Sequence, residues 1–478
     1  MNRRAKIIAT LGPASEDKKT IKNLLTAGMD VARINFSHGD LESHTRVIRT
    51  LRETAQELNR PITILQDLSG PKIRTGEIKS GKINLVQGKQ LILTTDNILG
   101  TEEIVSVNYP DLPQNAEVGG RILLDDGKLE LSVKKIKGSQ VVTEVVQGGV
   151  LKPRKGVNLP GTNLTIRTLT EKDLVDLKFG LAHDIDVLAL SYVRSANDIE
   201  RLREEIKKIN PDQSGIPIIA KLEHPEAIEN LHEIIHAADG VMVARGDLGI
   251  EMPPESVPII QKRIIAVANK HLSFVIIATQ MLESMVNNPR PTRAEASDVA
   301  NAVLDGCDAV MLSSETAIGK FPVKTVQMMA SIIQQSEDHS DEWGHSYFDP
   351  TEDAIHDNAV SITRAARELA HDRSVSAIAV FTRSGRTARL MSKARPRVPI
   401  LAFTPVEKTY QYLSMLWGTT PCLIPQAASI EEMLSHVDTE VIEGTQVKPG
   451  QEIVLIAGFP IDKMVPPNLA LLHTVKSR

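Results

Sequence analysis

Charged residues that could hold a phosphate and a metal ion follow two apolar runs of the chain. Lys221 and Glu223 close one run, and Arg245-Gly-Asp-Leu-Gly249 follows another. Side chains two residues apart on a strand leave the same face, so Lys221 and Glu223 are expected to enter one site. Glu223 and Asp247 together suit Mg2+, which commonly takes one or two protein carboxylates. Each pattern also has a plainer explanation, a surface ion pair in the first case and a turn in the second.

Phosphate-binding groups are concentrated in Val31-Ala-Arg-Ile-Asn-Phe-Ser-His-Gly39. The guanidinium of Arg33 suits paired hydrogen bonds to phosphate oxygens. Asn35, Ser37 and His38 follow closely and offer an amide, a hydroxyl and an imidazole. Taken alone, His38 is more often a hydrogen-bonded loop residue than a ligand or a base.

Two further segments end in residues that suit a substrate site. Asp67-Leu-Ser-Gly-Pro-Lys-Ile-Arg74 places Lys72 and Arg74 beside a Gly-Pro hinge, although a solvated basic loop would look the same. Thr279 ends the apolar run Phe274–Ala278, where its hydroxyl could contact substrate or cap a helix.

A loop near the carboxyl end has the composition of an anion pocket. Amides at a helix start, together with hydroxyls and guanidiniums, bind phosphate groups. The alternative is an ordinary capped loop with solvated arginines. The residues are Thr382, Arg383, Ser384, Gly385, Arg386 and Thr387.

The apolar runs indicate the scaffold that positions these residues. Eight short runs rich in valine and isoleucine alternate with helical sequence, which is typical of a parallel sheet buried on both faces. Eight such units are what a closed (β/α)8 TIM barrel requires, although periodicity alone does not separate a barrel from an open sheet. The runs are Lys6–Ala9, Val31–Asn35, Ile62–Gln66, Asp186–Leu190, Pro217–Lys221, Gly240–Ala244, Phe274–Ala278 and Asp308–Leu312.

The fold class expected from this pattern is α/β, with a small all-β domain inserted into the barrel and an open α/β domain at the carboxyl end. Asp126-Gly127 is predicted to join Arg121–Leu124 and Leu129–Val133 in a hairpin. An insertion after the third barrel strand is placed to close over an active site. The expected domains are a catalytic barrel of residues 1–70 and 169–340, an inserted β-barrel lid of residues 71–168, and a regulatory domain of residues 341–478.

The regulatory domain is predicted to alternate helices and strands. A helix near Asp353–His371 is followed by the expected strands Ser376–Phe381, Val398–Phe403 and Glu452–Gly458.

Composition narrows the range of partners. With 55 basic and 60 acidic residues the net charge is -5, which gives no field for wrapping nucleic acid or binding an anionic membrane. No apolar stretch approaches the ~20 residues of a membrane span, and strand-like sequence from Lys6 onward leaves no room for a signal peptide. Cys307 and Cys422 fall in different expected domains and suit small buried side chains. We expect a cytoplasmic protein that acts on small molecules.

Taken together and in order, the motifs resemble those of the pyruvate kinase family. The resemblance runs from near residue 3 to the end, and it is looser in the last domain. It implies phosphoryl transfer from phosphoenolpyruvate to ADP, giving pyruvate and ATP in the last step of glycolysis, by a homotetramer. The similar blocks are Arg33-Ile-Asn-Phe-Ser-His-Gly39, Lys221-Leu-Glu223, Ala244-Arg-Gly-Asp-Leu-Gly249, Ala278-Thr-Gln-Met-Leu-Glu-Ser-Met285 and Pro289-Arg-Pro-Thr-Arg-Ala-Glu295.

The resemblance also implies a role for each matched residue. Lys221 would neutralise charge on the phosphoryl group, and Arg33 would hold its oxygens. Glu223 and Asp247 would bind Mg2+ or Mn2+. The sequence does not name the group that protonates the enolate, for which Thr279 with a bound water is one candidate. Substrate would be bound by Arg33, Lys221, Gly246, Asp247 and Thr279, and the nucleotide by Asn35, His38, Arg74 and Lys155 of the inserted domain.

One departure from the family pattern concerns K+. Many members hold K+ with groups like Asn35, Ser37 and Asp67 together with the carbonyl of a neighbouring threonine, and carry a glutamate where this chain has Lys72. Here Leu68 stands in place of the threonine and Lys72 in place of the glutamate, which resembles the K+-independent branch. The Lys72 ammonium would supply the charge that K+ otherwise brings, so K+ is not expected as a cofactor.

The family uses the loop of residues 382–387 for a phosphorylated effector, so a sugar phosphate or nucleotide activator is expected. Three other functions stay open: a magnesium-dependent lyase or mutase acting on a keto-acid enolate, a Schiff-base aldolase using Lys221, and a retired kinase that senses metabolites. Lys155 favours nucleotide use, and no catalytic cation or carboxylate is missing from the motifs.

Overall fold

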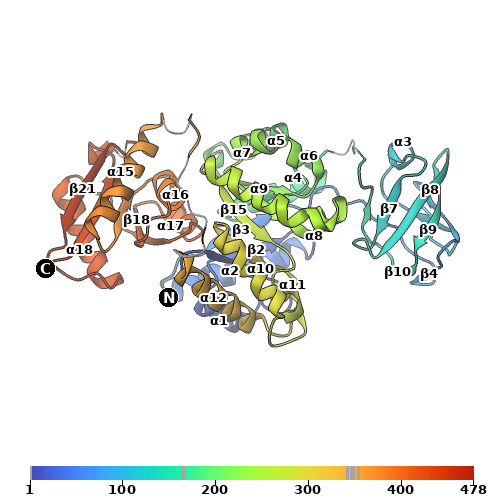
Figure 1. Ribbon diagram of the computed structural model, residues 1–478, viewed down its shortest axis with the longest axis horizontal. Helices are drawn as coiled ribbons and strands as arrows, with labels where there is room; N and C mark the ends of the chain where they lie inside the picture. Colours follow the sequence, from blue (N-terminus) through green and yellow to red (C-terminus); the bar gives the residue numbers. More distant parts are fainter. Residues whose placement is uncertain are drawn as a thin grey trace.

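Eight parallel strands close into a barrel at the centre of the molecule (Figure 1). The computed structural model describes residues 3–162, 167–340, 344, 350–352, 356–463 and 465–477. The apolar strands are buried on both faces, because side chains fill the inside of the barrel and helices cover the outside. All eight predicted runs are confirmed. The strands are β1 (Lys6–Thr10), β2 (Val31–Asn35), β3 (Thr63–Asp67), β12 (Val187–Leu190), β13 (Ile218–Leu222), β14 (Gly240–Ala244), β15 (Phe274–Ala278) and β16 (Ala309–Leu312).

Helices return the chain between these strands and form the outer layer. Capping residues set their ends: Asp17 accepts from the Thr20 amide at the start of α1, and Gly28 ends that helix with a φ of 118°. The helices are α1 (Lys18–Ala27), α2 (Leu41–Glu57), α4 (Glu171–Ala182), α5 (Ala196–Ile209), α6 (Pro225–Glu229), α7 (Leu231–Ala237), α8 (Arg245–Glu251), α9 (Val257–Lys270), α10 (Arg293–Leu304), α11 (Ser314–Ala317) and α12 (Pro322–Asp338).

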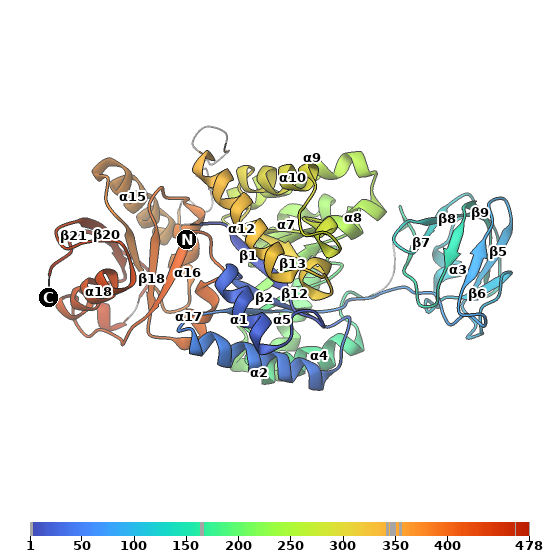
Figure 2. The ribbon, with the colours of Figure 1, turned by 90° about the horizontal axis from the view of Figure 1, so that it is seen from below.

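The chain between β3 and α4 forms a separate β-rich body beside the barrel (Figures 1 and 2). The predicted hairpin is confirmed, since β7 (Arg121–Leu124) pairs antiparallel with β8 (Leu129–Lys137). The described strands make a six-stranded sheet in the order β11-β7-β8-β9-β5-β6 and a two-stranded sheet of β10 and β4, together with the short helix α3 (Leu112–Asn115). The two edges of the larger sheet are joined by the chain that enters it, since Arg74 bridges to Gly156 beside β11 and Thr75 bridges to Val107 beside β6. The remaining strands are β4 (Ile83–Leu85), β5 (Gln90–Thr94), β6 (Ile104–Ser106), β9 (Gln140–Gln147), β10 (Gly149–Leu151) and β11 (Val157–Asn158).

The carboxyl-terminal part is an open five-stranded sheet flanked by helices, in the order β19-β18-β17-β20-β21. Three strands match the prediction: β17 (Ile378–Phe381), β18 (Ile400–Thr404) and β20 (Glu452–Ala457). Residues 353–355 of the helix expected near Asp353–His371 lie outside the described residues, and the described helix is α15 (Asn358–Arg373). The other elements are α16 (Arg386–Lys393), α17 (Glu407–Leu413), β19 (Thr419–Leu423), α18 (Ile430–Gly444) and the antiparallel strand β21 (Leu469–Thr474).

The barrel and the carboxyl-terminal sheet share a core. One apolar cluster runs from Ile8 and Ile276 inside the barrel to Ile378 and Val454 in that sheet. Asp308, at the amino end of β16, is fully buried between the two bodies. Its carboxylate lies 2.8 Å from the ammonium of Lys393 at the end of α16, and 2.7 Å from the guanidinium of Arg395.

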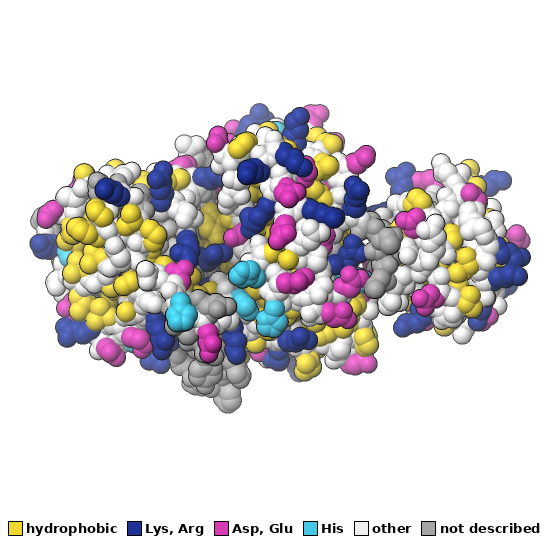
Figure 3. Space-filling model, turned by 90° about the horizontal axis from the view of Figure 1, so that it is seen from above, with side chains coloured by type: hydrophobic (Ala, Val, Ile, Leu, Met, Phe, Trp, Pro, Cys, Tyr) yellow, Lys and Arg dark blue, Asp and Glu magenta, His cyan; other side chains and the backbone are white. Residues whose placement is uncertain are grey.

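The surface carries both signs of charge. In Figure 3, basic and acidic side chains alternate over the exposed face, in keeping with the small net charge of -5. Among the described residues, no helix combines the length and apolar character that a bilayer-crossing segment needs.

Candidate active site

Two cations and two carboxylates meet at the carboxyl ends of β2, β3 and β13. Asp67 lies between the cations: its Oδ2 accepts from Arg33 Nε at 2.7 Å, and its Oδ1 is 3.2 Å from Lys221 Nζ. Lys221 Nζ is also 2.9 Å from Glu223 and donates to the Ser191 hydroxyl at 2.6 Å. The spacing of Lys221 and Glu223 therefore does bring both side chains to one site, which we call the barrel mouth.

The charges at the barrel mouth stabilise one another in a buried setting. Arg33, Asp67, Lys221 and Glu223 are each at most 8% exposed. Burial alone would raise the pKa of Asp67, but Lys221 and Arg33 outweigh it and hold that pKa below its usual range. Burial would likewise lower the pKa of Lys221, but Asp67 and Glu223 outweigh it and raise that pKa. Lys221 and Asp67 thus stay charged at neutral pH.

Asp247 adds a half-buried carboxylate beside Glu223. It lies in the first turn of α8, directly after β14. Burial raises the pKa of Asp247 to about 6, and the nearby charge of Glu223 adds to this rise. Among the described residues, no three His, Cys, Asp or Glu side chains form a metal cluster. Two carboxylates that repel each other nevertheless fit Mg2+ or Mn2+, because such an ion takes few protein ligands and substrate or water oxygens complete its shell.

Thr279 occupies a strained position at the end of β15. Its φ is 69°, and Gln280 follows with a φ of 54°. A β-branched residue at such an angle is a clear outlier, and strain of this kind persists where the surroundings hold it in place. The Thr279 hydroxyl accepts from the Gly246 amide at 2.8 Å, and its carbonyl accepts from Arg245 at 2.9 Å. The hydroxyl therefore does not cap a helix that follows it but binds the first turn of α8.

The segment after β12 supplies residues that the sequence did not single out. The Tyr192 amide donates to Glu223 Oε2 at 2.8 Å, and its hydroxyl lies 3.5 Å from Asp247 Oδ1. Tyr192 has a φ of 55°. Ser191, which accepts from Lys221, donates to the carbonyl of buried Leu68 at 2.7 Å. Both residues follow a barrel strand directly, so the rule that located Lys221 could also have found them.

Lys72, after β3, and His38, after β2, lie close enough to the barrel mouth for its charges to shift their pKa values. Burial lowers the pKa of Lys72, and Lys221 adds to this, whereas Asp247, Glu223 and Asp67 oppose it. The Lys72 residue is nevertheless exposed to solvent. Burial also lowers the pKa of His38, with Lys72, Arg74 and Arg33 adding to the fall. Near them, the Asn35 side chain accepts from the Ser37 amide at 3.1 Å.

Lys155 makes its described ion pair away from the barrel mouth. Its ammonium lies 2.7 Å from Asp125 in the inserted sheet. Arg74 is likewise tied to that sheet, because its guanidinium donates to the Arg154 carbonyl at 3.0 Å. The charge of Asp126, next to the Lys155 partner, is among those that raise the pKa of Asp247.

Comparison with known proteins decides the family. Residues 2–326 match the family model described as pyruvate kinase, barrel domain, and residues 360–473 match that described as pyruvate kinase, alpha/beta domain. The chain belongs to the pyruvate kinase family. It is 43% identical to a pyruvate kinase of Mycobacterium tuberculosis over 475 residues, which cover 99% of each chain. It is also 43% identical to a pyruvate kinase of Geobacillus stearothermophilus over 481 residues, 99% of this chain and 81% of that one.

Solved structures agree with this assignment. A pyruvate kinase from Cryptosporidium parvum superposes with a TM-score of 0.90 at 35% identity, covering 99% of this chain and 96% of that one. The closed barrel, the inserted sheets and the carboxyl-terminal α/β body are therefore the pyruvate kinase fold.

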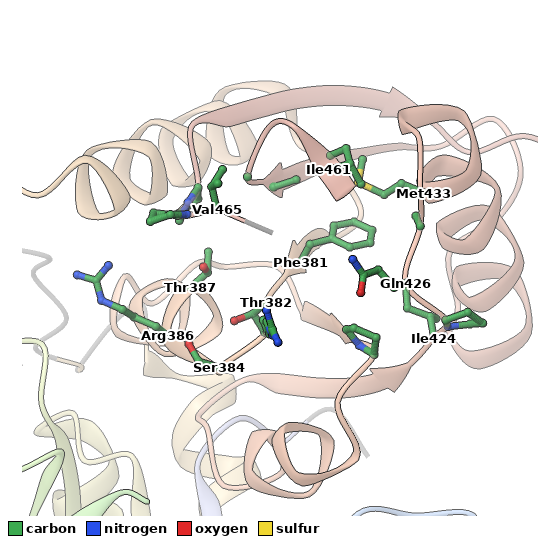
Figure 4. Close-up of a pocket in the computed structure, with 18 residues that line it drawn as sticks. Phe381, Thr382, Ser384, Arg386, Thr387, Ile424, Gln426, Met433, Ile461 and Val465 are labelled. Atoms are coloured by element: carbon green, nitrogen blue, oxygen red, sulfur yellow. The ribbon is translucent and has the colours of Figure 1, made fainter. Parts of the chain in front are cut away.

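A pocket in the alpha/beta domain of this pyruvate kinase family member contains the predicted anion loop (Figure 4). Gly385 begins α16 with a φ of 84°, and its amide donates to the Thr382 hydroxyl at 3.0 Å. A side chain at Gly385 would meet the Tyr412 ring at 2.9 Å, so only glycine fits there. Arg386 is paired with Asp357. The remaining wall is largely apolar and includes Phe381, Ile424, Met433, Ile461 and Val465.

Proposed function

We propose that this chain transfers the phosphoryl group of phosphoenolpyruvate to ADP, giving pyruvate and ATP. The observation that carries the proposal is the pairing of Lys221 and Arg33 through Asp67, with Glu223 and Asp247 alongside. Phosphoryl transfer depends mainly on positioning and on fixed charge, since little covalent chemistry is left to the protein. A preformed set of buried charges suits that task.

Each residue at the barrel mouth has a distinct part in the proposed reaction. Arg33 holds the phosphoryl oxygens, and Lys221 neutralises the charge that builds on the group as it moves. The Gly246 region and Thr279 position the substrate carboxylate, and Thr279 with a water delivers a proton to the enolate carbon. When Mg2+ or Mn2+ is bound, Glu223 and Asp247 hold it, and it polarises oxygens of the transferred group.

The nucleotide is proposed to bind between the barrel mouth and the inserted sheet. Asn35 and His38 approach it from the barrel, and Arg74 and Lys155 from the inserted sheet. Because Lys155 is paired with Asp125, a nucleotide phosphate would have to compete with that carboxylate for its ammonium. Lys72 replaces K+ in this scheme, and its place among Asp67, Glu223 and Asp247 supports this role.

The domains keep their expected roles in the proposal. Residues 1–70 and 169–340 form the catalytic barrel, residues 71–168 the lid, and residues 341–478 the regulatory domain. The separate sheets of each part support this division. A phosphorylated sugar or nucleotide effector binds the loop Thr382–Thr387. The protein works as a cytoplasmic homotetramer, as its family resemblance implies.

The decisive experiment is an assay of ADP-dependent pyruvate release from phosphoenolpyruvate, coupled to lactate dehydrogenase. The proposal expects release that requires ADP and Mg2+ and yields one ATP per pyruvate. Pyruvate formation without ADP would favour the lyase or mutase alternative. Borohydride trapping of a keto acid on Lys221 would favour the aldolase, and binding without turnover would favour the metabolite sensor.

A further inference from the structure

The inserted sheets, here called the lid, touch the barrel next to the metal carboxylates. Asn158 is the last residue of β11, which pairs with β7 of the lid sheet. Its side-chain amide donates to Glu251 Oε1 at 2.8 Å. Glu251 is the last residue of α8, so a strand of the lid is bonded directly to a barrel helix.

That helix also carries part of the site. Asp247 and Glu251 are four residues apart on α8 and therefore lie on the same face, one turn from each other. The start of α8 is fixed by the bond from Gly246 to Thr279 and by an ion pair between Arg245 and Asp298 at 2.6 Å. The lid is thus bonded to one end of a short helix whose other end holds Asp247.

The surroundings of Glu251 make this bond costly to lose. Asn158, Glu251, Tyr192 and His224 line one small pocket between the lid and the barrel, together with hinge residues of the lid. Within the described part of the chain, Glu251 Oε2 and His224 Nε2 are buried without a hydrogen-bond partner. If Asn158 moved away, neither oxygen of Glu251 would be paired, and a buried unpaired carboxylate is strongly unfavourable.

We propose that Asn158 and Glu251 are positioning residues for the reaction: their hydrogen bond fixes the orientation of the lid over the barrel mouth and couples it to Asp247 through α8. The inference rests on the proposed function, because it assigns the lid to nucleotide binding. Lys155 lies three positions before Asn158 in the chain, so the same bond sets where its ammonium can point.

Steady-state kinetics of the full-length protein test the proposal, with ADP and phosphoenolpyruvate varied separately. For Glu251→Ala and Asn158→Ala we expect the KM for ADP to rise about tenfold, since a hydrogen bond to a carboxylate is worth at least that factor. We expect any fall in kcat to be smaller than the rise in the KM for ADP, because neither residue meets the reacting group. Glu251→Gln retains an acceptor and should restore most of the parent KM. Gln147→Ala removes a lid amide that bonds only within the lid, to the Lys128 carbonyl in the described structure, and is the matched control.

A double-mutant cycle and hydrogen exchange complete the test. If the two residues act through one bond, Asn158→Ala with Glu251→Ala should be no worse than either single variant. The hinge amides of Thr75 and Val157, which bond across the two lid connections, should exchange faster in Glu251→Ala but not in Glu251→Gln. Additive losses, an unchanged KM for ADP, or equal exchange in both Glu251 variants would overturn the inference. Hydrogen exchange needs no turnover, so it tests the role of the Asn158–Glu251 bond even if the parent shows no ADP-dependent pyruvate release. Absence of that release would refute only the proposed function.

Discussion

Replacing Lys221 with methionine should remove most of the turnover, and it should also lower the melting temperature because buried Glu223 loses its ion-pair partner. The methionine chain fills nearly the same volume but carries no charge. A unit charge about 4 Å from a charge that builds in the transition state is worth roughly 4 kcal/mol at an effective dielectric constant of about 20. Losing roughly 2.7 kcal/mol of this would lower kcat about 100-fold. Lys221 lies 2.9 Å from Glu223 and 3.2 Å from Asp67, so it is already held where such a charge is needed.

The assay is ADP-dependent pyruvate release at saturating substrate, together with thermal unfolding of each variant. Lys18→Met is the matched control, because Lys18 is half-exposed and pairs only with Glu57 at 2.6 Å in the described structure. The control should keep the parent kcat. A Lys221→Met variant that folds and turns over within about threefold of the parent would refute the role given to this ammonium.

Four further predictions follow from the charges described above. Activity should persist in buffers free of K+, and Lys72→Glu should introduce a K+ requirement. The rate is measured against KCl concentration, with NaCl as the control. A steep K+ requirement in the parent would contradict the proposal that Lys72 replaces K+. Millimolar Mg2+ or Mn2+ should raise the melting temperature of the parent, and it should raise that of Asp247→Asn by less. An equal rise in both proteins would show that Asp247 does not bind the metal. Fructose bisphosphate, a sugar monophosphate or AMP should shift the phosphoenolpyruvate saturation curve of the parent but not of Arg386→Ala, and no shift in the parent would end the effector proposal. Burial lowers the pKa of Lys393 to about 8 from 10.5, so the folded state loses this proton before the unfolded state does. The free energy of unfolding of the parent, relative to Lys393→Met, should therefore rise between those two pH values in urea titrations, and a fall would show the opposite shift.

The barrel could be predicted from the sequence because its strands are buried on both faces. Such strands read as continuous valine- and isoleucine-rich runs, and all eight were located. The strands β19 and β21 were missed for a related reason. Both are edge strands of the carboxyl-terminal sheet and are only partly buried, and β19 contains Pro421, which is tolerated at a sheet edge but argues against a strand.

Some features of the candidate site could also be predicted from the sequence, and others could not. Lys221 and Glu223 could be paired from their spacing alone, because side chains on a strand alternate between its faces. The positive φ of Tyr192 and Thr279 could not be foreseen, since nothing local favours it in an aromatic or β-branched residue and only tertiary contacts hold it. The bond between Asn158 and Glu251 was also out of reach, because it joins two bodies through residues distant in the chain.

The placement of Asp308 limits how this molecule can be cut. Its carboxylate is buried, and both cations that balance it, Lys393 and Arg395, belong to the carboxyl-terminal domain. A fragment ending near residue 340 would keep the acid but lose its counter-charges, and it would expose the apolar cluster that begins at Ile8. Isolating an uncompensated buried charge is strongly destabilising. The barrel is therefore not an independently folding domain, and truncation near residue 340 should yield insoluble or unfolded protein.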